Sequence, residues 1–367
     1  MLIDTTLREG AQLFGTYFNR ETKERIISGL LALGTNEMEL GWVGQEGLKE
    51  LVEWARPIKG ETALSVWSPC RGADIRKAAA LGVDRVNIGV PVSDLHIENR
   101  LGTDREGLLE RLARSVLTAG ILGIRYISVG LEDASRADEA FALAAARLAQ
   151  DMGASRIRLA DSVGVLTPAR MMGLAATFRR HLDIDLAVHC HDDFGMATAN
   201  ALTALQAGAD YADCSILGIG ERSGIAATEE LATYLTLKED NHDDTYQTDG
   251  IRDLCNFVSH AAGVPIPRTK AVAGKDIFAC ESGIHVHAMG KSPDLFEPYN
   301  PDTIGANRIV AVGGKSGRRA VAGALEEHDI AHDEADLPTI VDAVRRLSHK
   351  LERPLTTMEL VSLTKAH

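Results

Sequence analysis

The sequence predicts a (β/α)8 TIM barrel with a C-terminal helical lid region. Short β-rich segments alternate with amphipathic helical stretches over the first 240 residues, and the count of such units is eight. Every cluster of polar, chemistry-bearing residues directly follows a strand, which is where such barrels keep their active sites. A chain of 367 residues can hold one barrel of about 250 residues and a smaller appendage. An open doubly wound sheet is the structural alternative, but no Gly-x-Gly-x-x-Gly motif follows the first strand.

The eight predicted strands lie at residues 2–5, 37–41, 63–67, 85–90, 126–131, 156–161, 185–191 and 211–217. The helices are expected near residues 21–33, 45–56, 73–81, 104–122, 135–152, 168–181, 196–208 and 225–239. Helix boundaries have local signals, because Pro168 opens one helix and Gly34, Gly82, Gly153 and Gly208 follow the ends of others. Local signals and alternation therefore agree.

The strand pattern stops near residue 240, so we assign residues 1–240 to the catalytic barrel. Residues 241–262 are expected to form a polar linker and the first helix of the C-terminal region. Residues 263–367 are predicted to form a lid and helical subdomain, in which prolines first break the chain into turns. Helices are expected there at 316–328, 334–350 and 356–365.

Composition narrows the setting of the protein. The chain is 45% apolar and 25% charged, as in ordinary globular proteins, and its net charge of −13 offers no general attraction for nucleic acid or an anionic membrane. Its five cysteines form no Cys-x-x-Cys pair, which indicates free thiols in a reducing compartment. A strand follows Met1 almost at once, and no apolar run approaches the roughly 18 residues that span a bilayer, so we expect a cytoplasmic protein.

The strongest motif is His189-Cys190-His191 at the end of the seventh strand. Side chains two apart on a strand point to the same face, so both histidines can bind one cation. Glu9, after the first strand, would add an oxygen ligand and leave open positions for a substrate. Single histidines often serve only as structural hydrogen-bonding groups, but three candidate ligands at one barrel mouth favour a metal site. Asp161 and Asp4 are candidates for orienting the ligands.

Arg8 follows the same strand as Glu9 and would stabilise negative charge on a metal-bound carbonyl. The alternative for Arg8 is a surface ion pair of little energetic value. On the fifth strand, Ser128, Gly130 and Glu132 share one face, and the two small residues leave room either for a substrate or for a bulky neighbour such as Trp67.

Four segments of the chain form a recognisable set: residues 4–12 (DTTLREGAQ), 159–164 (LADSVG), 189–193 (HCHDD) and 218–222 (GIGER). Together they resemble the homocitrate synthase and isopropylmalate synthase family, and the resemblance covers nearly the whole chain. It is closest to the nitrogen-fixation type of homocitrate synthase.

The resemblance implies a Claisen condensation, in which the enolate of acetyl-CoA attacks the ketone of a metal-bound 2-oxo acid and the thioester is then hydrolysed. It assigns Glu9, His189 and His191 to a divalent cation such as Zn, Mn or Mg, and Arg8 to polarising the ketone. It further implies a homodimer, in which the lid of one subunit crosses to its partner. The remaining implied roles are substrate contacts by Gln12 and Ser162 and acid/base chemistry by Glu132, His285 and Tyr299.

Departures from the family pattern leave the substrate open. Glu9 replaces the Asp of many relatives, Ile225 replaces an Asn, and Cys280 replaces a His in the lid. Lysine-pathway relatives hold the far carboxylate of 2-oxoglutarate with an Arg and a Ser on the fifth strand and a His on the third. This chain is expected to place Ser128, Gly130 and Trp67 there, with Ser128 as a substrate contact.

The leading substrate is 2-oxoglutarate, with another 2-oxo acid, as in isopropylmalate, citramalate or citrate synthases, as the alternative. A retro-Claisen lyase of the same barrel family is a second hypothesis, although such lyases use a cysteine in the loop after the eighth strand and this loop has none. A binding module without turnover is the third. Because the chain stops near residue 367, a long regulatory domain is not expected.

Overall fold

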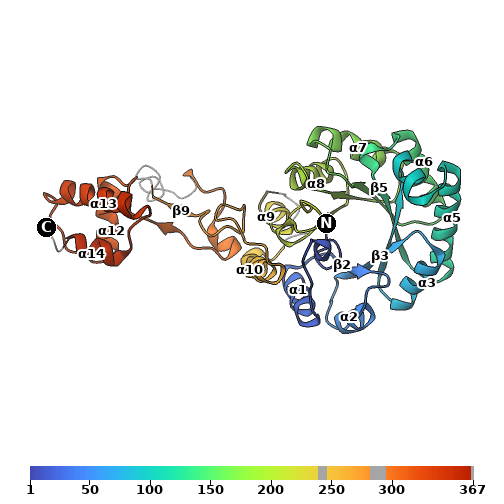
Figure 1. The fold of residues 1–367 in the computed structure, drawn as a ribbon, viewed down its shortest axis with the longest axis horizontal. Coiled ribbons are helices and arrows are strands. Elements are labelled where there is room, and N and C mark those ends of the chain that lie inside the picture. The colour runs from blue at the N-terminus through green and yellow to red at the C-terminus, as the bar shows by residue number, and fades with distance from the viewer. Residues whose placement is uncertain (239–245, 282–294, 365–367) are drawn as a thin grey trace. The chain divides into compact units, whose positions relative to one another are not determined.

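The computed structural model describes residues 1–238, 246–281 and 295–364. It contains a closed barrel of eight parallel strands in the order β1 to β8, with helices between them (Figure 1). The barrel closes where β8 pairs with β1 in the register Leu2 to Ala212. The predicted (β/α)8 fold is therefore confirmed. The strands are β1 (Leu2–Asp4), β2 (Glu37–Trp42), β3 (Ala63–Pro69), β4 (Arg85–Pro91), β5 (Tyr126–Glu132), β6 (Arg156–Asp161), β7 (Asp185–Cys190) and β8 (Tyr211–Cys214).

The helices of the barrel cover its outside and bury their apolar faces against the strands. Asp104 caps the longest of them by accepting a hydrogen bond from the backbone of Gly107, and Asp138 caps another in the same way. They are α1 (Arg20–Leu33), α2 (Leu48–Ala55), α3 (Gly72–Leu81), α4 (Asp94–His96), α5 (Arg105–Ile121), α6 (Glu139–Asp151), α7 (Pro168–His181), α8 (Ala197–Gln206) and α9 (Thr228–Lys238).

Strand β8 is shorter than predicted. It ends at Cys214, whereas the sequence suggested residue 217, because a tight turn over Ile216–Gly218 follows it. Leu217 has φ +61° in that turn, a left-handed conformation that cannot continue a strand.

The lower barrel interior is an ion-pair network. Arg156 is fully buried and donates from Nη1 and Nη2 to the two carboxylate oxygens of Glu37, at 2.8 and 3.0 Å. Its Nη2 also donates to Asn87 at 3.1 Å, and its Nε donates to Ser128 at 3.0 Å. All donors and acceptors in this network come from strands, so the charges are held rigidly beneath the mouth of the barrel.

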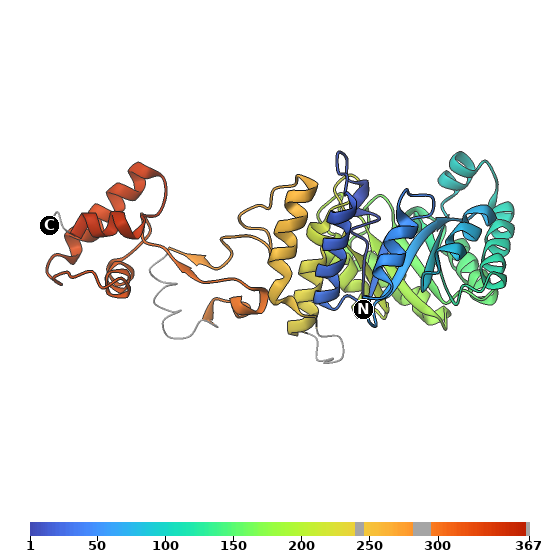
Figure 2. The same ribbon diagram turned by 90° about the horizontal axis from the view of Figure 1, so that it is seen from below.

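Helix α10 (Ile251–Ala262) packs beside α1 of the barrel (Figure 2). The guanidinium of Arg25 lies 4.0 Å from the ring centroid of Phe257, and Leu254 contacts the helix at Gly29, where a side chain would collide with it. We expected this helix to open the C-terminal region, but it falls within the first of two compact units, Met1–Ile266.

The second unit, Pro267–His367, contains α12 (Arg318–Glu327), α13 (Leu337–Leu351) and α14 (Thr357–Thr364). These helices share a small core that includes Val321, Leu325 and Val344. Two short strands, β9 (Ala279–Cys280) and β10 (Ile309–Val310), pair in parallel, although the sequence showed no strand pattern there.

All five cysteines are free, as expected. Among the described helices, none combines the length and the apolar character that crossing a membrane requires.

Candidate metal centre and active-site cavity

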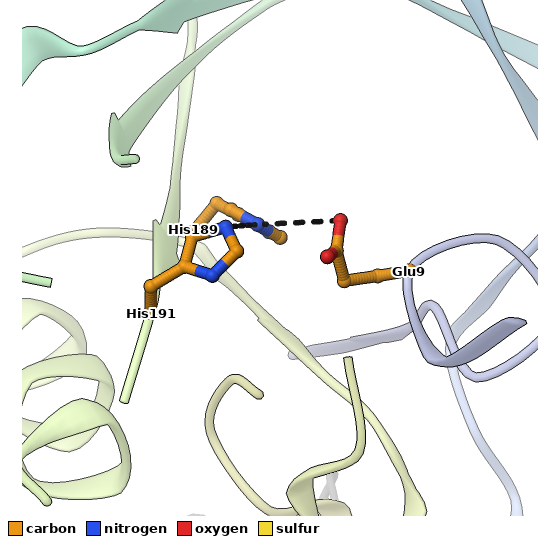
Figure 3. Close-up of side chains that lie close together, drawn as sticks. All are labelled: Glu9, His189 and His191. Atoms are coloured by element: carbon orange, nitrogen blue, oxygen red, sulfur yellow. Dashed lines mark hydrogen bonds and ion pairs between the residues drawn. The ribbon is translucent and has the colours of Figure 1, made fainter. Parts of the chain in front are cut away.

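Glu9, His189 and His191 converge at the mouth of the barrel (Figure 3). Glu9 lies in the turn after β1, and the histidines lie at and just beyond the end of β7. His189 Nε2 is 3.3 Å from His191 Nε2 and 3.9 Å from Glu9 Oε2. All three side chains are buried, and one donor atom from each lies within 4.8 Å of the others. The sequence-predicted ligand set is therefore assembled in space.

The protonation states of these groups suit a cation. Burial and the neighbouring His189 lower the pKa of His191 to about 3, so its imidazole is neutral and able to coordinate. Burial alone would raise the pKa of Glu9, but Arg8 and His189 lower it to about 2. His191 Nδ1 is buried and has no hydrogen-bond partner among the described residues. Two imidazoles and one carboxylate fit zinc, manganese or iron, and magnesium with additional water ligands.

Asp213 on β8 orients His189, a role that the sequence analysis did not assign to it. Its Oδ2 lies 2.8 Å from His189 Nδ1 and 3.0 Å from Arg158 Nη1. Burial opposes ionisation of Asp213, but Arg158 and the bond to His189 hold the pKa of its carboxyl below the usual value. An anionic partner on Nδ1 fixes the tautomer that leaves Nε2 free for a metal.

Asp4 and Asp161, which we expected near the ligands, serve other groups. Asp4 accepts hydrogen bonds from Thr6 N at 2.9 Å and Thr228 Oγ1 at 2.7 Å, and burial raises the pKa of Asp4 to about 6. The Asp161 carboxylate accepts backbone hydrogen bonds from residues 165 and 166, at 3.1 and 2.8 Å. Both carboxylates therefore stabilise the chain near the site without holding a ligand.

Arg8 is buried beside the candidate ligands. Its Nε donates to Glu39 on β2 at 2.6 Å, and its Nη1 forms an ion pair with Glu9. Burial disfavours a charged guanidinium, but Glu39 and Glu9 raise the pKa of Arg8 above its ordinary value. Arg8 therefore stays cationic at the position where we predicted a charge-stabilising group.

The ligands border a cavity of about 510 Å³ at the barrel mouth. Arg8, Gln12, Glu132 and Ser162, which the sequence assigned to the site, line it together with Trp67, Asn87, Gly89, Arg100, Gly130, Arg158, Ala160, Val163, Glu221 and Arg222. Glu132 Oε2 accepts from Arg100 Nη1 at 2.9 Å, and Ser162 Oγ accepts from Asp133 N at 2.8 Å. None of the described residues that line the cavity is a cysteine.

Ser128 lies below this cavity. It is fully buried, and its hydroxyl accepts a hydrogen bond from Arg156. Strand parity placed Ser128 inside the barrel correctly, but its depth and its partner differ from the expected substrate contact. Arg158, two residues after Arg156 on β6, lines the cavity. The sequence analysis did not single it out.

The two lid residues have different outcomes. His285 lies outside the described residues. Tyr299 belongs to the second unit, where its ring packs edge-on against Phe278 with centroids 5.5 Å apart. The positions of the two units relative to one another are not determined, so the acid/base role of Tyr299 stays a prediction.

Comparison with known proteins agrees with this geometry. Residues 1–258 match the HMGL-like family, and residues 272–352 match the family described as homocitrate synthase post-HMGL domain-like. Homocitrate synthase 1 of Nostoc sp. is 38% identical over 367 residues, which cover 100% of this chain and 97% of that protein. The chain belongs to the homocitrate synthase and 2-isopropylmalate synthase family. It is thus an enzyme of the condensing acyltransferase type.

A second relative in this family is 2-isopropylmalate synthase 2 of Caldanaerobacter subterraneus, 36% identical over 99% of this chain and 94% of its own length. Among solved structures, hydroxymethylglutaryl-CoA lyase from Pseudomonas aeruginosa superposes with a TM-score of 0.63 at 21% identity. That match covers 71% of this chain and 92% of the lyase, and it shows that the two proteins share a fold.

Proposed function

We propose that the protein condenses acetyl-CoA with a 2-oxo acid, and that 2-oxoglutarate is the acceptor, giving homocitrate and CoA. The observation that carries this proposal is the juxtaposition of Glu9, His189 and His191 with the buried Arg8 at one cavity. Relatives named homocitrate synthase and 2-isopropylmalate synthase, which match nearly the whole chain, support this type of reaction.

In this proposal Glu9, His189 and His191 hold a divalent cation. When bound, the cation supplies Lewis-acid polarisation of the acceptor ketone and orients the 2-oxo acid. Asp213 fixes the orientation of His189, and Arg8 stabilises the negative charge that develops on the ketone oxygen.

The carbon–carbon bond forms after a base removes a methyl proton of acetyl-CoA. The resulting enolate carbon attacks the ketone carbon, the ketone oxygen becomes a hydroxyl by taking up a proton, and water then cleaves the thioester to release CoA. We assign the proton transfers to Glu132, whose carboxylate lines the cavity, together with His285 and Tyr299. Gln12 and Ser162 contact the 2-oxo acid.

The oligomer and the location of the protein belong to the same proposal. We infer a cytoplasmic homodimer in which residues 263–367 act as a lid that crosses to the partner subunit. The test is a heterodimer in which one subunit has an inactivated barrel and the other lacks His285. Each homodimer would be inactive, and the heterodimer would regain activity if the lid of the first subunit reaches the barrel of the second.

The test of function is release of free CoA thiol from acetyl-CoA by the metal-loaded protein with a panel of 2-oxo acids. We expect release with 2-oxoglutarate above a control without acceptor. The panel includes oxaloacetate, pyruvate and 2-oxoisovalerate, and release with one of these alone would reassign the acceptor. Failure with every acceptor would contradict the proposed condensation.

A retro-Claisen lyase makes a different prediction. Lyases of this barrel family use a cysteine in the loop after β8, whereas that loop contributes Glu221 and Arg222 to the cavity here. Formation of acetyl-CoA from a 3-hydroxyacyl-CoA thioester, without condensation, would favour the lyase.

A further inference from the structure

Gly130 on β5 leaves a recess in the cavity wall, whereas the space beside its neighbour Gly89 is filled by Trp67 and the Glu132 carboxylate. Gly89 on β4 and Gly130 on β5 are direct neighbours in the sheet, and both line the cavity. A Cβ atom at Gly130 would meet nothing nearer than Ile88 O at 3.8 Å and Gly89 Cα at 3.9 Å. The barrel therefore leaves open the space that a side chain at position 130 would fill.

Two hydrogen-bond donors border this part of the cavity. Arg158 is the register partner of Gly130 on β6, and only 4% of its side chain is exposed. It uses Nη1 and Nη2 to bind Glu39 and Nη1 to bind Asp213, whereas its Nε is buried without a partner among the described residues. A guanidinium has five N–H donors, so Arg158 can donate a hydrogen bond to a further acceptor group.

Trp67 supplies the second donor. Its indole lies against Gly89, where a Cβ atom would be 2.6 Å from Trp67 Cζ2 and 2.8 Å from Trp67 Nε1. Trp67 lines the cavity, and its indole N–H has no hydrogen-bond partner among the residues that the structure describes. An indole nitrogen is a donor only, so it also calls for an acceptor.

Arg158 lies close beneath the candidate metal ligands. Its register partner is Ala187, two residues before His189 on β7, and its Nη1 is 3.0 Å from Asp213 Oδ2, the oxygen that lies 2.8 Å from His189 Nδ1. A 2-oxo acid held at the candidate ligands therefore needs only a short tail to bring its far end to Arg158.

We propose that Arg158 and the Trp67 indole N–H bind the distal carboxylate of a dicarboxylic 2-oxo acid, whose tail occupies the recess beside Gly130. This inference rests on the proposed condensation and specifies its acceptor. It explains how the chain can dispense with the fifth-strand Arg that lysine-pathway relatives use. A purely apolar tail would leave both donors buried without an acceptor, which disfavours its binding.

The test compares two five-carbon acids that differ only at the far end. Titration calorimetry on the metal-loaded protein measures binding of 2-oxoglutarate and of 2-oxovalerate, which has a methyl group in place of the distal carboxylate. We expect the wild type to prefer 2-oxoglutarate. Loss of one hydrogen bond to a charged group weakens binding by about 10- to 100-fold, so Trp67→Phe should reduce the preference by at least about tenfold.

Two further variants keep the test independent of any one substitution. Arg158→Lys retains the charge needed by Glu39 and Asp213 but loses the forked donors, and it should also reduce the preference. Gly130→Ala adds only a methyl group to the recess and should weaken binding of both five-carbon acids more than binding of pyruvate. Trp54→Phe, on α2 away from the cavity, is the matched control and should leave the preference unchanged.

The inference is overturned if the wild type binds 2-oxovalerate as tightly as 2-oxoglutarate, or if the preference survives in both Trp67→Phe and Arg158→Lys. Its failure is distinguishable from failure of the condensation. CoA release with monocarboxylic acceptors only would overturn the dicarboxylate site and leave the condensation standing. A binding preference that depends on Trp67 and Arg158, without CoA release from any acceptor, would support the site and contradict the condensation.

Discussion

Substitution of Gly89 by Ala should disturb both stability and turnover. A Cβ atom at this position would lie 2.5 Å from Glu132 Oε1 and 2.6 Å from Trp67 Cζ2, whereas carbon atoms pack at about 3.5–4.0 Å. The indole or the carboxylate must therefore move by about 1 Å. Overpacking of this kind costs typically 1–3 kcal/mol of unfolding free energy. Because the groups that move line the cavity, we also expect turnover to fall.

Gly130→Ala is the matched control for stability. The two glycines are direct sheet neighbours, but a Cβ atom at Gly130 meets ordinary contacts at 3.8 Å or more. We therefore expect its unfolding free energy to stay within about 0.5 kcal/mol of the wild type, since neither strain nor a cavity is introduced. Urea unfolding, followed by circular dichroism at one pH and one metal concentration, compares them. Equal stability of the two variants would refute the steric reasoning.

Three further predictions concern charge and metal. Glu37→Gln should lower the free energy of unfolding by about 3 kcal/mol at pH 7, because Arg156 holds the pKa of the buried Glu37 near 2 against 4.5 in the unfolded chain. This stabilisation is present above pH 4.5 and is lost as the pH falls toward 2. Urea unfolding should therefore show a wild-type advantage that shrinks below pH 4.5, and a difference that stays constant with pH would contradict the prediction. Asp213→Asn should weaken metal affinity about 10- to 100-fold in a competitive chelator titration, and unchanged affinity would exclude its orienting role. Glu9→Ala or His191→Ala should lower both metal content, measured by elemental analysis, and turnover; retention of both would rule out the proposed ligand set.

The fold followed from periodic features that are local in the sequence. Alternation of strands and helices, with glycine at helix ends, suffices to count eight units, because each unit is a short segment with its own hydrophobic pattern. The boundary between the two units was harder to predict, because it depends on contacts between distant parts of the chain. Helix α10 belongs with α1 because of packing between side chains more than 200 residues apart, such as Arg25 and Phe257.

The candidate metal site was predictable because its residue types and spacing are distinctive. His189 and His191 share strand parity, and Glu9 follows a strand at the same mouth. The supporting residues were not predicted, since Asp213 and Arg158 gain meaning only from partners on other strands. Parity marks Asp213 as inward-facing, but it gives no depth. The same limit explains Ser128, which faces inward and yet lies beneath the cavity in contact with Arg156.

The ion pairs of the barrel interior make one part of its wall less tolerant of substitutions than the other. Strands β2, β6 and β8 contribute Glu39, Arg158 and Asp213, which form ion pairs with one another and with Arg8 and orient a candidate metal ligand. Replacing one of them would leave a buried charge without its counterpart, which is strongly destabilising. On β3, β4 and β5 the cavity wall is formed by Trp67, the paired glycines and the Glu132 carboxylate, which pairs with Arg100 and takes no part in these ion pairs. A lineage could therefore alter the accepted 2-oxo acid by changing Trp67 or the two glycines while the candidate metal ligands stay intact.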